Sequence, residues 1–186
     1  PLSHPCGPGL GELPPGIPVV LTDHGFWQDL RCPRDLDKVR ETVRLARGII
    51  AVSRHCLERE DRDGLVPAGI RRVIHNPVSL PPGSAARSGA ASGRRQVLFA
   101  AGVEPIARKG LDILIRAFAE NRRLRSEAEL IVITDKPSGE WAARAMASAG
   151  IAGGSFPLRP AGEMAAAYAA ADVFALPSRS EAFPLV

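Results

Sequence analysis

Short apolar runs alternate along the chain with longer segments in which apolar residues recur every three or four positions. The runs that predict buried strands are residues 18–22, 49–52, 72–74, 96–101, 130–134, 156–158 and 173–176. Helical spacing is found over residues 39–46, 111–118, 140–149 and 163–171. Continuous apolar strands separated by helices predict an α/β fold whose parallel sheets are covered on both faces.

Single residues predict where one helix begins, where another ends and which strand lies at an edge of its sheet. Ser53 follows the strand 49–52 and has the side chain of a helix N-cap, so we expect it to begin the next helix. Gly150 is placed to end the helix before it. Pro157 cannot donate to a strand ladder, so its strand should lie at an edge of the sheet.

Two segments lack the pattern of a core. Residues 1–18 contain six prolines and four glycines, which predicts a loop. Residues 77–95 hold a Pro-Pro-Gly-Ser sequence followed by a tract of Ser, Gly, Ala and Arg, which is typical of a linker. We therefore expect three parts: a first unit over 1–76, a linker over 77–95 and a second unit over 96–186.

The composition narrows the class of protein. An apolar share of 45% is enough for a core, and the net charge of +4 favours anionic partners. The aromatic residues are not interleaved with basic ones, so nucleic acid is not an expected partner. The arginines at 116, 122, 123 and 125 form either a solvated surface or a basic face for anionic lipid.

Location and processing are judged from the cysteines, the apolar runs and the first residues. Cys6, Cys32 and Cys56 form no CxxC pair and are odd in number, which favours a reducing, cytoplasmic setting. The most apolar stretch, 164–177, is interrupted by a charged residue, so no membrane-spanning helix is expected. No signal peptide is visible, and without an initiator methionine the chain is expected to be a fragment.

The first candidate site lies between the strand 96–101 and the helix that follows it. Arg108 and Lys109 stand beside a helix start, where free backbone N–H groups and the positive end of the helix dipole favour anions. Arginine as a fork and lysine as a point charge suit a pyrophosphate. The alternative is a solvated basic turn without a ligand.

The second candidate follows the strand 173–176. The strand runs into a loop that bears Ser178, Ser180 and Glu181. Because the carboxyl ends of parallel strands meet at one edge, a carboxylate here could bind sugar hydroxyls. The alternative is that Glu181 is a surface or capping residue.

The two candidate stretches occur in a recurring order. A strand is followed by a loop ending in Lys-Gly and a long helix; later a helix precedes Ala-Ala-Asp, a strand ending in Pro-Ser, and Glu-x-Phe. This order resembles the donor-binding domain of glycosyltransferase family 4, the retaining GT-B enzymes. The segments Ile-Ala-Val-Ser at 50–53 and Val-Ile-His-Asn-Pro at 73–77 are similar to the end of that family's first domain.

The resemblance implies roles for residues of the turn after the strand 96–101, which we call the phosphate turn (residues 102–110). Lys109 matches the basic residue that contacts the donor diphosphate and stabilises the leaving nucleotide, and Arg108 precedes it where some members also carry arginine. Gly102 matches the glycine of the strand-end turn. The chain departs from the family at Val103, where many members carry a second phosphate-binding arginine.

The resemblance also implies a sugar site and a reacting centre. Glu181 matches the first glutamate of the family's paired-glutamate motif and should face the donor sugar. The backbone groups of Ala182 and Phe183 lie where the family cradles sugar and phosphate. His24 matches a histidine near the acceptor or the reacting centre, and it joins Glu181 and Lys109 as a candidate catalytic residue.

By resemblance, the fold is GT-B-like, with two doubly wound Rossmann-like units of which the first is incomplete and acceptor-side. The implied activity is transfer of a glycosyl group, with retention, from a nucleoside diphosphate sugar to a glycan or lipid-linked acceptor. No metal or other cofactor is implied, and the location is cytoplasmic, with peripheral contact at the inner membrane face as an option. The second glutamate would fall beyond Val186, so we expect the 186-residue chain alone to be inactive.

Two other readings remain open. One is a non-catalytic nucleotide-binding or scaffolding module with the same Rossmann-like fold, which Val103 favours. The other is a regulatory or basic polyanion-binding domain, since a doubly wound fold by itself does not determine function.

Overall fold

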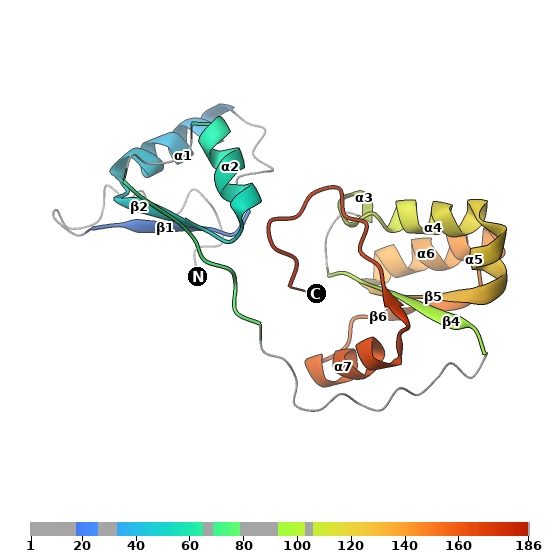
Figure 1. The fold of residues 1–186 in the computed structure, drawn as a ribbon. Helices are drawn as coiled ribbons and strands as arrows, with labels where there is room; N and C mark the ends of the chain where they lie inside the picture. The colour runs from blue at the N-terminus through green and yellow to red at the C-terminus, as the bar shows by residue number, and fades with distance from the viewer. Residues whose placement is uncertain (1–17, 26–32, 65–68, 79–92, 103–105, 186) are drawn as a thin grey trace. The chain divides into compact units, whose positions relative to one another are not determined.

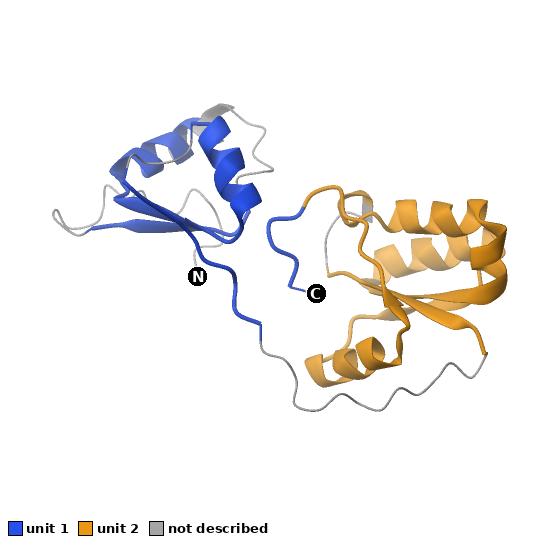
Figure 2. Cartoon of the chain, viewed as in Figure 1, with its two compact units in different colours: residues 1–78, 181–185 blue, residues 79–180, 186 orange. Residues whose placement is uncertain are grey.

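The structure is a computed structural model of the chain, and it describes residues 18–25, 33–64, 69–78, 93–102 and 106–185 (Figure 1). The chain divides into two compact units, shown in Figure 2. Unit 1 comprises residues 1–78 and 181–185, and unit 2 comprises residues 79–180 and 186. Each unit has its own parallel sheet.

Unit 1 is a three-stranded parallel sheet with two connecting helices. Its elements are β1 (Val20–Asp23), α1 (Pro33–Leu45), β2 (Gly48–Ala51), α2 (Arg54–Arg62) and β3 (Ile70–Val73). The strands lie in the order β1-β2-β3, and both helices cover the same face in Figure 1. The expected cap is confirmed, because the Ser53 hydroxyl oxygen accepts a hydrogen bond from the Cys56 N–H at 3.2 Å.

The core of unit 1 lies between the middle strand and the helices. Val39 and Val43 are one helical turn apart on α1 and are both buried, as their spacing predicts. They are joined in the core by Ile49, Ala51, Val52 and Cys56. By contrast, all four residues of β3 are exposed, so β3 is an open edge of the described sheet.

Unit 2 is a four-stranded parallel sheet in the order β6-β5-β4-β7. Its strands are β4 (Arg95–Ala100), β5 (Ala128–Thr134), β6 (Gly153–Pro157) and β7 (Val173–Phe174). Its helices are α3 (Ile106–Lys109), α4 (Leu111–Glu120), α5 (Arg122–Glu127), α6 (Lys136–Ser148) and α7 (Ala161–Ala170). The edge position expected from Pro157 is confirmed, since β6 is the first strand of the sheet.

Both faces of the unit 2 sheet are covered, because side chains alternate along β4. Val97 and Phe99 belong to a cluster with residues of α4 and α6, whereas Leu98 and Ala100 pack with residues of α7. Fully burying one large apolar side chain such as Phe99, which is 1% exposed, contributes about 1.5–3 kcal/mol. The predicted parallel sheet with two covered faces is therefore confirmed for this unit.

Local capping moves the start of one helix. The sequence pattern predicts a helix from residue 140, but α6 begins at Lys136. Asp135 is its N-cap: one carboxylate oxygen accepts from the Ser138 N–H at 3.0 Å and the other from the Ser138 hydroxyl at 2.8 Å. Pro137 lies in the first turn, where its missing N–H costs nothing.

Strand ends also differ from the expected ones. β6 begins at Gly153, three residues earlier than the apolar run, because its backbone pairs with Leu130. Two glycines at 153 and 154 give no apolar signal, so periodicity could not find this part of the strand. β7 ends at Phe174, two residues early, although the Ala175 N–H still donates to the Leu98 carbonyl at 2.8 Å.

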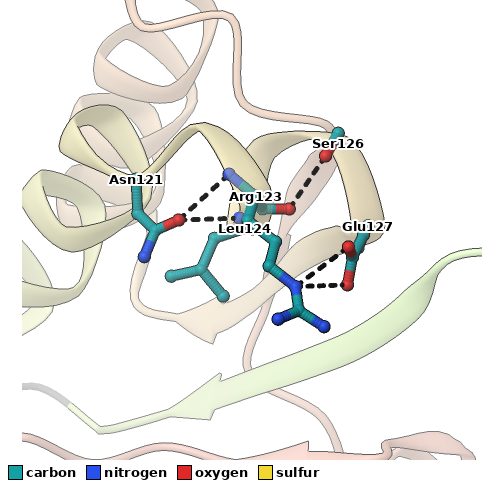
Figure 3. A network of polar contacts seen from close by, with 5 residues as sticks. All are labelled: Asn121, Arg123, Leu124, Ser126 and Glu127. Carbon is teal, nitrogen blue, oxygen red and sulfur yellow. Dashed lines mark hydrogen bonds and ion pairs between the residues drawn. The ribbon is translucent and has the colours of Figure 1, made fainter.

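The short helix α5 was not predicted, and its own side chains define it (Figure 3). The Asn121 side-chain oxygen accepts hydrogen bonds from the N–H groups of Arg123 and Leu124, at 3.0 and 3.1 Å. Arg123 Nε pairs with both carboxylate oxygens of Glu127, at 3.0 and 3.1 Å. The Ser126 hydroxyl donates to the Arg123 carbonyl at 3.0 Å. These polar contacts replace the apolar stripe that predicts longer helices.

The same contacts show what two of the four arginines near α5 do. Arg123 is paired with Glu127, and Arg125 donates to the Phe118 and Ala119 carbonyls at the end of α4. Arg116 and Arg122 are exposed on the surface. Two of the four arginines therefore have structural roles, and the cluster is not a single free basic face.

Candidate functional site

The strand-end turn of unit 2 holds the expected phosphate-binding residues. Gly102 is exposed just after β4, and Arg108 and Lys109 are half-buried at the end of the one-turn helix α3. Val103 lies outside the described residues. The helix start that follows them is that of α4, which has Gly110 as its N-cap and no side-chain cap. Gly110 therefore supplies no side-chain acceptor to this helix start, although the Asp112 carboxylate in the first turn accepts from the backbone of Asp112 and Ile113.

Gly110 joins this turn to the loop that follows β7. Its φ of 76° is a left-handed conformation, and an added Cβ would lie 1.9 Å from the Pro177 carbonyl oxygen. Only a residue without a side chain fits both conditions. The two candidate stretches, which are about 70 residues apart in sequence, are thus in direct backbone contact.

Arg179 fixes the same contact from the other loop. Its two terminal nitrogens bind the two carboxylate oxygens of Asp112 at 2.8 and 2.7 Å, and its backbone N–H donates to the Arg108 carbonyl at 2.8 Å. The guanidinium also donates to the Ala107 carbonyl. The hydrogen bond from Arg179 holds the pKa of Asp112 below its usual value. A bidentate pair of this kind orients the loop more than it stabilises the fold, because both groups are exposed to water.

Sequence reasoning did not assign a role to Arg179, although it named the surrounding Ser178 and Ser180. The one sequence feature related to this pair is Asp112 in the first turn of a helix. Acidic residues are common at that position, so Asp112 does not by itself indicate Arg179 as its partner. The pairing spans 67 positions, so it becomes visible only when the loops are placed together.

The residues expected to face the donor sugar are grouped with unit 1. Glu181, Ala182 and Phe183 are half-buried. The Cys56 thiol donates a hydrogen bond to the Ala182 carbonyl at 3.7 Å. The Phe183 ring stacks on His75 with a centroid distance of 5.1 Å. Glu181 also directly follows Ser180 in the chain, so it remains one residue from the loop held by Arg179.

His24 directly follows β1, at the edge of the sheet where ligands of parallel sheets gather. Its side chain is exposed, whereas the neighbouring Asp23 is 2% exposed and points inward, as alternation along a strand requires. A carboxylate oxygen of Asp23 accepts from the Gly25 N–H at 2.9 Å. The hydrogen bond closes the turn that carries His24, and His24 is not a core residue.

A second buried carboxyl group lies beside Asp23. Glu60 of α2 is 4% exposed, and neither of its carboxylate oxygens has a hydrogen-bond partner among the described residues when both acids are ionised. Burial, and then the proximity of Asp23, raises the pKa of Glu60 to about 9. A proton on Glu60 allows it to donate to the Asp23 side chain, so we interpret Glu60 as protonated at neutral pH.

Two further properties concern metals and membranes. Within the described ranges, no three histidine, cysteine, aspartate or glutamate side chains gather in a way that could hold a metal ion. Among the helices of the same ranges, none combines the length and apolar character needed to cross a bilayer.

The Glu60 pair predicts a particular dependence of stability on pH. Because the folded-state pKa is raised, this group's stabilising contribution is complete below about pH 4.5 and is lost as the pH rises towards about 9. The loss approaches ~1.4 kcal/mol per pH unit between these values. Glu60→Gln, which keeps a neutral donor, should melt like the parent at pH 5 and at a higher temperature at pH 8. Equal differences at both pH values, measured by circular dichroism, would contradict a protonated Glu60.

Loss of the Arg179–Asp112 ion pair should change the local dynamics of the loop after β7. Arg179→Gln should speed amide hydrogen exchange at residues 175–180 severalfold while changing the melting temperature little, because the lost pair is exposed. Arg123→Gln, which removes another exposed pair of unit 2, is the matched control and should leave this loop unchanged. The parent loop should itself loosen in acid, where Asp112 takes up a proton. Exchange that is the same in all three proteins would show that Arg179 does not hold the loop.

Solved structures share this architecture. A lipopolysaccharide outer core galactosyltransferase, WaaB, matches with a TM-score of 0.62 and 19% identity, over 78% of this chain and 40% of that one. HepE of Anabaena, solved with UDP and glucose, matches with a TM-score of 0.60 and 18% identity, over 89% and 47%. WaaG, a glycosyltransferase of lipopolysaccharide biosynthesis, matches with a TM-score of 0.55 and 16% identity, over 89% and 52%. At these identities the likeness establishes the fold, which is that of GT-B glycosyltransferases.

The chain spans about half the length of these structures or less. Among curated proteins, none matches its sequence. A family model described as glycosyl transferases group 1 matches residues 94–186, which are half of the chain and contain both of the loops joined at Gly110. The chain belongs to the family of group 1 glycosyl transferases.

Proposed function

We propose that the protein transfers a glycosyl group, with retention, from a nucleoside diphosphate sugar to a glycan or lipid-linked acceptor. Residues 96–186 then bind the donor and residues 1–76 are part of the acceptor side, with the linker 77–95 between them. The observation that carries the proposal is the family match over 94–186, together with the direct contact of the two candidate loops at Gly110. The solved structure of HepE with UDP-glucose supports a nucleotide sugar as donor.

The donor diphosphate is assigned to the turn formed by Gly102, Arg108 and Lys109. Lys109 is half-buried, and a partly desolvated cation attracts phosphate more strongly than one in bulk water. The start of α4, whose N-cap Gly110 has no side chain, adds the positive end of the helix dipole beside it. In this proposal the cations and the helix start stabilise the charge that develops on the leaving nucleoside diphosphate, without a metal ion.

The donor sugar is assigned to Glu181 and to the backbone of Ala182 and Phe183. Glu181 follows the loop that Arg179 holds to the phosphate turn, so its backbone starts from a fixed point. A carboxylate at this position accepts hydrogen bonds from sugar hydroxyls and orients the anomeric carbon. His24 is assigned to the reacting centre because its side chain is exposed at a strand end.

The proposed location depends on the net charge, and a second candidate function depends on one residue, Val103. A cytoplasmic enzyme with peripheral contact at the inner membrane face fits the net positive charge and a lipid-linked acceptor. A nucleotide-binding module without transferase activity is the second candidate, and Val103 in place of the usual arginine favours it. The two functions are distinguished by turnover, since only the enzyme consumes the donor.

Lys109 gives the direct test of the donor site. Lys109→Ala should weaken the binding of nucleoside diphosphates about tenfold or more, because one charge-assisted contact is lost. Calorimetry with UDP, GDP and ADP would measure this without knowing the sugar. Lys136→Ala removes the same charge from an exposed position on α6 and should bind like the parent. An equal loss in both variants would mean that net charge, and not a site at Lys109, sets the affinity.

His24 gives the test of the reacting centre. In the full-length enzyme, His24→Ala should lower turnover of the accepted nucleotide sugar by about a hundredfold while leaving the melting temperature unchanged, because the side chain is exposed. His55→Ala replaces another exposed histidine of unit 1 and should retain full turnover. Normal turnover with a lowered melting temperature in His24→Ala would instead assign His24 a structural role.

A further inference from the structure

Unit 1 carries a basic cleft that the proposed transferase reaction does not use. The cleft has a volume of about 1010 Å³. Half of its lining residues are arginines, namely Arg40, Arg44, Arg47, Arg71 and Arg72. It lies where α1 ends and where β2 and β3 begin, and is therefore at the amino-terminal edge of the parallel sheet. His24 lies at the opposite, carboxyl-terminal edge.

The backbone that lines the cleft is fixed around Arg47. The Arg47 N–H donates to the Val19 carbonyl at 2.7 Å, and its own carbonyl accepts from the Ile70 N–H at 3.1 Å. An added Cβ at Gly69 would lie 2.0 Å from the Arg47 carbonyl oxygen, so glycine is required for this approach. The Arg47 side chain therefore projects from a point held by two strands and is not on a free loop.

The positive charge of the cleft is only partly balanced. Arg40 pairs with Asp37 at 3.2 Å and Arg71 with Asp61 at 3.0 Å. Within the described part of the chain, neither Arg44 nor Arg47 has a carboxylate within ion-pair distance. Guanidinium groups gathered without counter-ions repel one another, so the arrangement favours an anionic ligand that neutralises them.

Helix capping does not account for this number of arginines. Arg44 lies in the last turn of α1, where one cation complements the negative end of the helix dipole. Arg71 and Arg72 lie on β3, and Arg47 lies between α1 and β2, so none of these three caps a helix. The Arg72 guanidinium donates to the Arg71 carbonyl at 2.8 Å, and both arginines line the cleft.

We propose that this cleft is a second anion site, which binds phosphate groups of an oligophosphate or of a phospholipid surface. Arginine forks match the oxygens of phosphate in pairs, and several phosphates are needed to balance the charge. Leu45 and Ile70, which are 57% and 54% exposed, flank the arginines and supply the apolar contact that a bilayer interface would use. The two sources of phosphate share the same recognition chemistry.

The test uses the full chain and two phosphate probes. Calorimetry measures binding of inorganic tripolyphosphate, and co-sedimentation measures binding to phosphatidylcholine vesicles with and without phosphatidylglycerol. The double variant Arg44→Gln/Arg47→Gln should bind at least about tenfold more weakly, since two phosphate contacts are lost. The control Arg122→Gln/Arg144→Gln removes the same charge from exposed positions of unit 2 and should bind like the parent. Arg72→Gln, which leaves α1 intact, serves if the double variant does not fold.

The pattern of binding decides both the proposal and the source of phosphate. Cleft-dependent binding of tripolyphosphate alone identifies a soluble ligand, and cleft-dependent binding of phosphatidylglycerol vesicles identifies a membrane surface. Either result supports the site, and neither depends on donor binding or turnover. The proposal is overturned if neither probe binds the parent chain, or if the control variant loses as much affinity as the cleft variants.

Discussion

The close approach of Gly110 to the Pro177 carbonyl is the constraint on which the candidate donor site depends. A side chain at position 110 would lie 1.9 Å from that oxygen, so the corner between α3 and α4 would have to separate from the loop after β7. Lys109 directly precedes this glycine, and Ser178 directly follows the proline. The contact thus sets the distance between the cations assigned to phosphate and the loop that leads to Glu181. Neither the turn before α4 nor the loop after β7 fixes this distance without the contact between them.

The electrostatic contacts around that corner act on position more than on stability. Arg179 and Asp112 are both exposed, and such pairs contribute little to the free energy of folding. Their bidentate geometry, together with the backbone hydrogen bond to Arg108, still restricts the loop to one orientation. Pairing Asp112 with Arg179 also compensates the negative charge at the start of α4, where an unpaired carboxylate would repel an anionic ligand.

The sequence predicts those parts of the fold that depend on local apolar patterns. The parallel strands β4 and β5 and the face of α4 follow from continuous runs and helical spacing, because burial selects the same residues. Features made by polar contacts were missed: α5 depends on Asn121 and Glu127, and the early start of α6 depends on Asp135. In the candidate site, Lys109 was predicted from its neighbours in sequence. Arg179 and the Glu60–Asp23 pair were not, since their partners are distant along the chain.

The two edges of the unit 1 sheet carry opposite kinds of charge, and the strand direction explains why they are separate. At the carboxyl ends, Asp23 and Glu60 are buried; with a proton on Glu60 the two groups carry a single negative charge, and the Asp23 carboxylate closes the turn to Gly25. At the amino ends, Arg44 and Arg47 are exposed without carboxylate partners among the described residues. The β2 strand between them is only four residues long, so about 13 Å of backbone separates the edges. The basic cleft and the turn that carries His24 therefore lie at opposite ends of the same strands, so a phosphate ligand bound by Arg44 and Arg47 would not contact the groups that position His24.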